Sequence, residues 1–171
     1  MHIKEEVRER HTLAIIVDNE PGILARIAGL FTARGYNIES LTVTDISEDD
    51  LISRITIVTS ASAPVMEQIL AQLERLVPVH KVVDLTALGP HVERELALVK
   101  VVGAGEHRIE ALRLAEVYRA RVLDATTSSF VFEVTGGTQK VDTFIELMRE
   151  VGLVEVARTG VVAIARGREP A

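Results

Sequence analysis

The chain has 171 residues, of which 47% are hydrophobic and 26% charged, and its formal net charge is −6. This composition excludes a disordered chain, and the acidic balance argues against nucleic-acid binding, which usually needs a basic stripe. The absence of cysteine excludes disulfides, thiolate metal ligands and a cysteine nucleophile.

The first half of the chain predicts six elements in the order β-α-β-β-α-β, the ferredoxin-like pattern. Strands are predicted where short aliphatic or alternating runs occur, and helices where apolar residues recur at three and four positions. Pro21 and Pro64 mark the first turns of the two helices, and Gly35 marks the end of the first helix. The predicted elements cover residues 12–18, 21–34, 37–46, 51–59, 63–76 and 79–85, with a solvated turn over 47–50.

The second half repeats this architecture without recognisable sequence identity to the first half. We therefore expect an α+β protein of two consecutive ferredoxin-like βαββαβ units, with domains at 11–87 and 92–166. Each sheet is expected to be antiparallel, with helices on one face and the other face open to a partner. A linker over 87–91 contains Gly89-Pro90. The predicted elements of the second unit cover residues 96–102, 106–120, 122–124, 130–134, 141–151, 154–156 and 161–164, and a frayed tail follows.

The stretch Asp18–Gly22 brings a set of turn-forming residues to the start of a helix. The unpaired N–H groups and the dipole of a helix start favour an anion, and a glycine there lets a carboxylate approach the backbone. Because no cation is evident there, a small carboxylate fits better than a polyphosphate. Asn37 offers an acceptor for the ammonium group of a zwitterion, from the same chain or from a second copy.

A purely structural interpretation of these residues stays open beside the ligand-binding one. Asn19 or Glu20 could simply cap the helix, because both residue types accept hydrogen bonds from N–H groups of a first turn. Asn37 could likewise only extend the turn that follows Gly35.

Residues 19–43, "NEPGILARIAGLFTARGYNIESLTV", resemble the ACT domain of the regulatory small subunit of acetohydroxyacid (acetolactate) synthase. The similarity continues through "SRITIVT", "QILAQLERLVPVHKVVDL" and "HVERELALVKV", and reaches "EVARTGVVAIARG" near the C-terminus. It covers nearly the whole chain from about His11. The flanks "RGYNIESLTV" and "ERELALVKV" are specific to this family among ACT domains.

The resemblance implies that the N-terminal unit is an ACT domain that pairs with a second copy of the chain. It also implies that branched-chain amino acids, chiefly valine, bind at the interface of this homodimer as feedback inhibitors. The residues that match the family's ligand site are Asn19, Pro21, Gly22, Ile23 and Leu24 from one chain and Asn37 and Ile38 from the other.

The resemblance further implies a partner, the catalytic large subunit, on which thiamine diphosphate, magnesium and FAD are expected. This chain is then not an enzyme: it carries no catalytic residue, no metal site and no cofactor, and it activates the large subunit and makes it sensitive to valine. The alternative is a stand-alone amino-acid-responsive ACT switch that regulates another partner, although no basic helix supports a link to transcription. An enzyme that acts by itself ranks third.

Other signals are set aside. Gly103-Ala104-Gly105 precedes a predicted helix as in dinucleotide-binding proteins, but Arg108 stands where the third glycine belongs. His91, Glu93 and Glu95 alternate and could hold a metal from one strand face, although such runs more often face solvent. No apolar run reaches the roughly 18 residues of a membrane span, and residues 1–10 do not resemble a signal peptide. We therefore expect a cytoplasmic protein.

Overall fold

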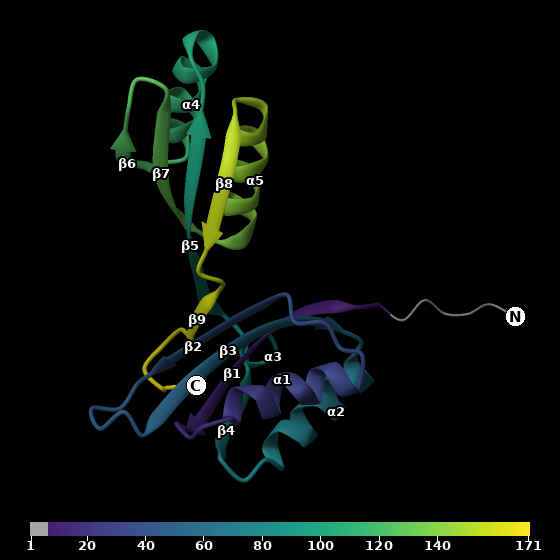
Figure 1. The fold of residues 1–171 in the computed structure, drawn as a ribbon. Coiled ribbons are helices and arrows are strands. Elements are labelled where there is room, and N and C mark those ends of the chain that lie inside the picture. Colours follow the sequence, from purple (N-terminus) through teal and green to yellow (C-terminus); the bar gives the residue numbers. More distant parts are fainter. Residues whose placement is uncertain (1–6) are drawn as a thin grey trace, which may run out of the picture. The chain divides into compact units, whose positions relative to one another are not determined.

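The computed structural model describes residues 7–171 and separates into two compact units (Figure 1). The first unit consists of two segments of the chain, the N-terminal segment up to Val92 and the C-terminal segment Ala163–Ala171. The second unit is Glu93–Val162. The sequence-based domain limits, 11–87 and 92–166, do not include a C-terminal segment in the first unit. These limits stay predictions.

The first unit has the predicted element order and one antiparallel sheet, with its two long helices on one face (Figure 1). Its elements are β1 (Glu9–Asp18), α1 (Ile23–Ala33), β2 (Ser40–Asp45), β3 (Ile52–Ala61), α2 (Ala63–Glu74), β4 (Val79–Asp84) and the short α3 (Leu85–Leu88). The strand order is β2-β3-β1-β4. The predicted strand over 37–46 is shorter than expected, because β2 begins only at Ser40, and α3 occupies part of the predicted linker.

The core of the first unit lies between this sheet and the helices α1 and α2. Leu13 of β1 lies opposite Ile57 of β3, and Ile15 lies opposite Ile55; all four side chains are fully buried. The helices add a stripe of buried residues, which are Ile23, Ile27, Phe31, Met66, Ile69 and Leu73. The period-two and period-3.6 apolar patterns therefore predicted this side of the sheet correctly.

The opposite face of the same sheet is partly covered, so the prediction of a fully open face was wrong for the first unit. Four residues of β1 and β3 on that face are at most 3% exposed, namely Thr12, Ala14, Thr56 and Val58. Leu85 of α3 and Ala163 of the C-terminal segment form a small cluster with Ala14. The Arg54 Nη2 also donates a hydrogen bond to the Ala163 carbonyl at 2.8 Å. The predicted frayed tail thus follows a segment that is packed against the first unit.

Helix α1 ends at the predicted glycine. Gly35 has a φ of 68°, its N–H donates to the Thr32 carbonyl at 3.1 Å, and the Tyr36 N–H donates to the Phe31 carbonyl at 2.9 Å. These two bonds form a Schellman motif, which an edge-to-face contact between Phe31 and Tyr36 supports. The motif fixes the direction in which the chain leaves α1 toward Asn37.

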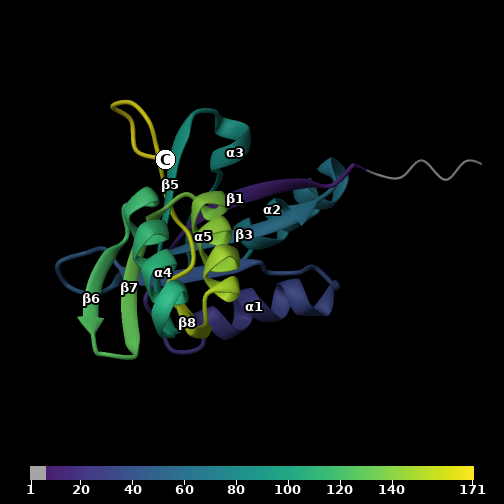
Figure 2. The ribbon, with the colours of Figure 1, turned by 90° about the horizontal axis from the view of Figure 1, so that it is seen from above.

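The second unit repeats the architecture, so the predicted α+β fold of two ferredoxin-like units is confirmed. Its antiparallel sheet has the strand order β6-β7-β5-β8, and β9 also pairs with β5. Both helices lie on one face of the sheet (Figures 1 and 2). The elements are β5 (His91–Val102), α4 (Gly105–Val117), β6 (Arg121–Ala125), β7 (Ser129–Gly136), α5 (Thr138–Glu150) and β8 (Leu153–Arg158). The last strand, β9 (Val162–Ala165), begins at the end of this unit, and its remaining residues belong to the C-terminal segment of the first unit.

A buried carboxylate reinforces the second unit. The Glu95 side chain is 3% exposed and accepts a hydrogen bond from Arg158 Nε at 2.6 Å, while Arg158 Nη1 lies 2.7 Å from Asp142 Oδ1. The hydrogen bond to Glu95, together with the one to Asp142, raises the pKa of the Arg158 guanidinium above its ordinary value. The three side chains tie β5, β8 and α5 together.

Candidate functional site

The candidate site begins in the exposed loop between β1 and α1. The Asn19 N–H donates to the Leu51 carbonyl at 2.7 Å, and Asn19 Nδ2 donates to the Asp50 carbonyl at 2.8 Å. Both acceptors belong to the turn that joins β2 and β3. This turn, predicted to be only a solvated loop, therefore fixes the position of Asn19 through two hydrogen bonds. Hydrogen bonds from Ser47 and from the Leu51 N–H lower the pKa of the Asp49 carboxyl in the same turn.

No side chain caps the start of α1. Gly22 is the N-cap residue, and its carbonyl accepts the first helical hydrogen bond, from Arg26 N–H at 3.0 Å. The expectation that Asn19 or Glu20 caps the helix was therefore wrong, because Asn19 turns to the β2–β3 loop and the Glu20 carboxylate pairs with Arg26. Pro21 lies in the turn before the cap and not in the first helical turn.

The amide hydrogens of this first turn remain available to a ligand. Within residues 7–171, the structure gives them one acceptor, the Glu20 carbonyl, which accepts from the Ile23 N–H at 3.3 Å. Gly22 has a φ of 85°, and a Cβ built at this position would meet no atom within 4 Å. The helix start is thus uncapped and open on the side of Gly22, which is the arrangement that a small anion needs.

Sequence reasoning missed a cation beside this helix start. The Arg26 guanidinium lies 3.2 Å from the Glu20 carboxylate, and about half of each side chain is exposed. The signal was the four-residue spacing from Gly22, which brings Arg26 one helical turn above the cap. A ligand carboxylate at the helix start would therefore lie near a cation that can leave a weak, exposed ion pair.

The other predicted site residues divide into exposed and buried groups. Leu24 is 38% exposed, whereas Ile23 is 6% exposed and belongs to the core. Asn37 is exposed, and its main-chain carbonyl accepts a hydrogen bond from Thr59 Oγ1 at 2.6 Å, so its backbone is fixed while its side chain faces solvent. Ile38 is half-buried against the core.

The two halves of the predicted site lie at opposite ends of α1 in one chain. Gly22 precedes the helix and Asn37 follows it, and 11 helical residues span about 16 Å at 1.5 Å per residue. One amino acid is much shorter than that. The two halves can therefore contact the same ligand only when they come from two copies of the chain.

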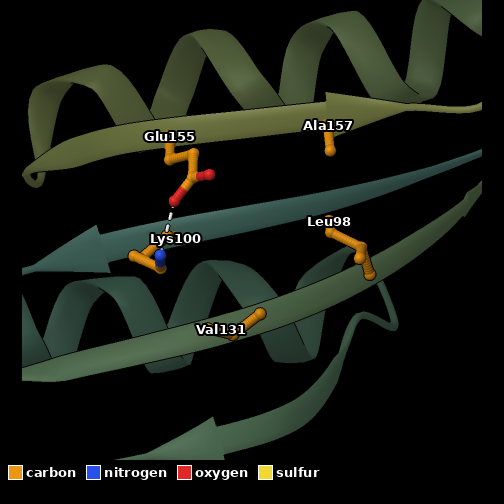
Figure 3. A pocket seen from close by; sticks show the side chains of 5 residues that line it. All are labelled: Leu98, Lys100, Val131, Glu155 and Ala157. Atoms are coloured by element: carbon orange, nitrogen blue, oxygen red, sulfur yellow. Dashed lines mark hydrogen bonds and ion pairs between the residues drawn. The ribbon is translucent and has the colours of Figure 1, made fainter.

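The alternative sites have less support. On the second unit's sheet, a hollow of about 210 Å³ is lined by Leu98, Lys100, Val131, Glu155 and Ala157 (Figure 3). Lys100 and Glu155 form an ion pair across it, and the hydrogen bond from Lys100 lowers the pKa of the Glu155 carboxyl. Each charge is therefore already compensated before any ligand binds.

The two other sequence signals also have structural explanations. Residues 7–171 contain no cluster of three potential metal ligands, and in the proposed trio with His91 and Glu93 the Glu95 carboxylate is bound by Arg158. The Gly103–Gly105 turn precedes α4 in an antiparallel sheet, and Arg108 stacks on the Phe130 ring at 3.9 Å. Among the described residues, 7–171, no helix is both long and apolar enough to cross a bilayer.

Comparison with known proteins decides the family. Residues 13–81 match a family described as "AHAS small subunit-like ACT domain", and residues 94–167 match "Small subunit of acetolactate synthase". The chain belongs to the acetolactate synthase small-subunit family. The N-terminal unit is accordingly an ACT domain.

Individual relatives agree over nearly the full length. The probable acetolactate synthase small subunit of Archaeoglobus fulgidus is 49% identical over 94% of this chain and 99% of its own length. The acetolactate synthase isozyme 3 small subunit of Escherichia coli is 45% identical, with coverage of 92% and 96%. The crystal structure of the acetolactate synthase small subunit from Thermotoga maritima superposes with a TM-score of 0.84 at 37% identity, and covers 94% of this chain and 99% of its own.

Proposed function

We propose that this chain is the noncatalytic regulatory subunit of an acetolactate synthase. It activates a separate catalytic large subunit, on which thiamine diphosphate, magnesium and FAD would be bound, and it makes that subunit sensitive to feedback inhibition. The observation that carries the proposal is the family match of both units, over residues 13–81 and 94–167.

The effector in this proposal is a branched-chain amino acid, chiefly valine, at the interface of two ACT domains. The uncapped start of α1 would bind the carboxylate through amide hydrogens, and Asn19 is held beside it by its bond to Asp50. Asn37 of a second copy would accept hydrogen bonds from the ammonium group. The exposed part of Leu24, with Ile38 of that copy, would contact the aliphatic side chain.

Inhibition then follows from a shift between two arrangements of the paired ACT domains. Valine stabilises the inhibited arrangement only as far as it binds that arrangement more tightly than the active one. A ligand held by two copies senses their relative position, since a displacement of one copy separates its half of the site from the other half.

The test is reconstitution with the catalytic large subunit of the same organism. Acetolactate formation is measured for the large subunit alone, with this chain, and with this chain plus valine, and the two proteins are tested for co-elution. We expect co-elution, a higher rate with this chain, and loss of that gain when valine is added. Two proteins that elute separately, with a rate that this chain does not change, would refute the regulatory assignment.

A further inference from the structure

Two opposite charges lie side by side at the open start of α1. The Glu20 carboxylate and the Arg26 guanidinium are 3.2 Å apart, and their side chains are 46% and 48% exposed. An ion pair with this much exposure contributes little to stability, so opening it costs little free energy. The pair therefore keeps a carboxylate and a cation beside the proposed ligand position without binding them tightly to each other.

The main chain around both residues is fixed, although their exposed side chains can turn. The Glu20 N–H donates to the Asp18 carbonyl at 3.0 Å, and the Glu20 carbonyl accepts from the Ile23 N–H at 3.3 Å. The Arg26 N–H donates to the Gly22 carbonyl, and helical side chains lean toward the helix N-terminus, so the guanidinium lies over the first turn. A ligand at this turn is therefore within reach of both charges.

The proposed effector is a zwitterion, but the site built so far accommodates only its negative charge well. The amide hydrogens of the first turn would bind its carboxylate, whereas its ammonium group has only the neutral side-chain oxygen of Asn37 from a second copy. A positive charge enclosed between two chains without a negative partner keeps most of its desolvation cost. Asp18, two residues before Glu20, already lies 2.5 Å from His80 Nε2. Glu20 is the better placed carboxylate, because its one partner is the exposed Arg26.

We propose that Glu20 and Arg26 recognise the two charges of the effector. The ligand enters between them: its carboxylate pairs with Arg26 and the amide hydrogens, and its ammonium group pairs with Glu20. An ammonium group has three N–H donors, so it also binds Asn37 of the second copy. One exposed ion pair is thereby exchanged for two around the ligand. This inference rests on the proposed effector site and adds to it a requirement for an α-amino group.

The consequence is selectivity for an α-amino acid over a simple carboxylate with the same carbon skeleton. Isovalerate is valine without its amino group, so it keeps the aliphatic side chain and the carboxylate. It competes with Glu20 for Arg26 and offers Glu20 no positive charge in return. We therefore expect the wild-type chain to bind isovalerate about a hundredfold more weakly than valine.

The test compares valine and isovalerate on the full chain by isothermal titration calorimetry. Glu20→Gln keeps the shape of the side chain and removes its charge. It should weaken valine binding about tenfold without weakening isovalerate binding, because glutamine neither attracts the ammonium group nor competes strongly for Arg26. Arg26→Gln removes the cation that both carboxylates use and should weaken both ligands about tenfold.

Glu110→Gln is the matched control. Glu110 and Arg113 form another exposed ion pair, on α4 of the second unit, at 2.8 Å and with side chains 38% and 70% exposed. This variant also loses one surface ion pair and one negative charge, but far from the proposed site in the sequence and in the other compact unit. It should leave the affinities for valine and isovalerate unchanged.

Three results of Glu20→Gln would overturn the inference. Unchanged valine affinity would mean that the ammonium group is bound elsewhere. Stronger binding of both ligands would mean that Glu20 only competes for Arg26, and equal weakening of both would mean that the ion pair only supports the loop. In each case the wild-type chain still binds valine, so the proposed effector stands. A wild-type chain that binds neither ligand would overturn the proposed effector and this inference together.

Discussion

Gly22 combines a backbone requirement with a requirement for space. Its φ of 85° lies in the left-handed region, where any L side chain is strained by about 1 to 2 kcal/mol, and asparagine is strained less than most. The position where a Cβ would stand is open. The positive φ is needed for the fold, whereas the open space beside Gly22 leaves room for a ligand. A test of ligand binding therefore needs two substitutions with the same backbone strain and different charge.

We expect Gly22→Asp to weaken valine binding by about a hundredfold or more, because its carboxylate competes for the amide hydrogens and repels the carboxylate of valine. Gly22→Asn has the same shape and similar strain without the charge, and should weaken binding by about tenfold or less. Isothermal titration calorimetry of both variants measures the difference. Equal affinities for the two variants would place the carboxylate of the ligand elsewhere.

Replacing Arg158 is expected to lower the stability of the second unit. Arg158→Met leaves the Glu95 carboxylate, 3% exposed, without its cationic partner. We expect the free energy of unfolding to fall by about 2 to 3 kcal/mol in urea denaturation, because a buried charge that loses its partner keeps its desolvation cost. Asp142→Asn removes the other, half-exposed partner of Arg158 and should cost less than about 1 kcal/mol. A similar loss in both variants would contradict this division.

At the scale of elements, local signals were predictable and long-range ones were not. The end of α1 at Gly35 follows from a Schellman motif built within a few residues. The start of α1 was predicted incorrectly, since the side chain of Asn19 binds a loop 31 residues away in the sequence. Likewise, no local pattern indicates that Ala163 covers Ala14 on the back of the first sheet.

The candidate site shows the same division. Resemblance and helix-start chemistry predicted Asn19, Pro21–Leu24, Asn37 and Ile38 as site residues. The structure shows an open, uncapped helix start among them. The role of Arg26 beside Glu20 was missed, because its pairing depends on how the loop before α1 folds back. Outside the site, only the structure shows that Ile109, Leu112 and Val117 of α4 are exposed while Leu114 packs against the core.

The C-terminal segment offers a prediction at this scale. Ala163 is 8% exposed and lies in a cluster with Ala14 and Leu85, whereas its neighbour Ile164 is 64% exposed. Ala163→Asp should lower the free energy of unfolding by about 2 to 4 kcal/mol, because it buries a carboxylate in an apolar cluster. Ile164→Asp should change it by less than about 0.5 kcal/mol. Thermal or urea unfolding of both variants is the measurement, and a neutral Ala163→Asp would show that the segment is not part of the packed unit.

For the molecule as a whole, the separation of Gly22 and Asn37 by α1 makes the proposed site a property of two chains. A two-fold pair has two such sites, and each uses the helix start of one chain and Asn37 of the other. In this proposal, valine bound there would stabilise one relative position of the two chains over others, which is what coupling to a catalytic partner requires. Valine bound at a site within one chain would make no direct contact that depends on the relative position of the two chains.

Mixing two defective chains tests this arrangement directly. Gly22→Asp damages the helix-start half, and Asn37→Ala damages the other half, so homodimers of either variant should bind little valine. When equal amounts are refolded together, about half of the dimers are mixed and each has one intact site, so about a quarter of the wild-type sites should return in a calorimetric titration. The regained sites should bind with wild-type affinity, because both of their halves are unaltered. If both halves belonged to one chain, mixing would restore none of them.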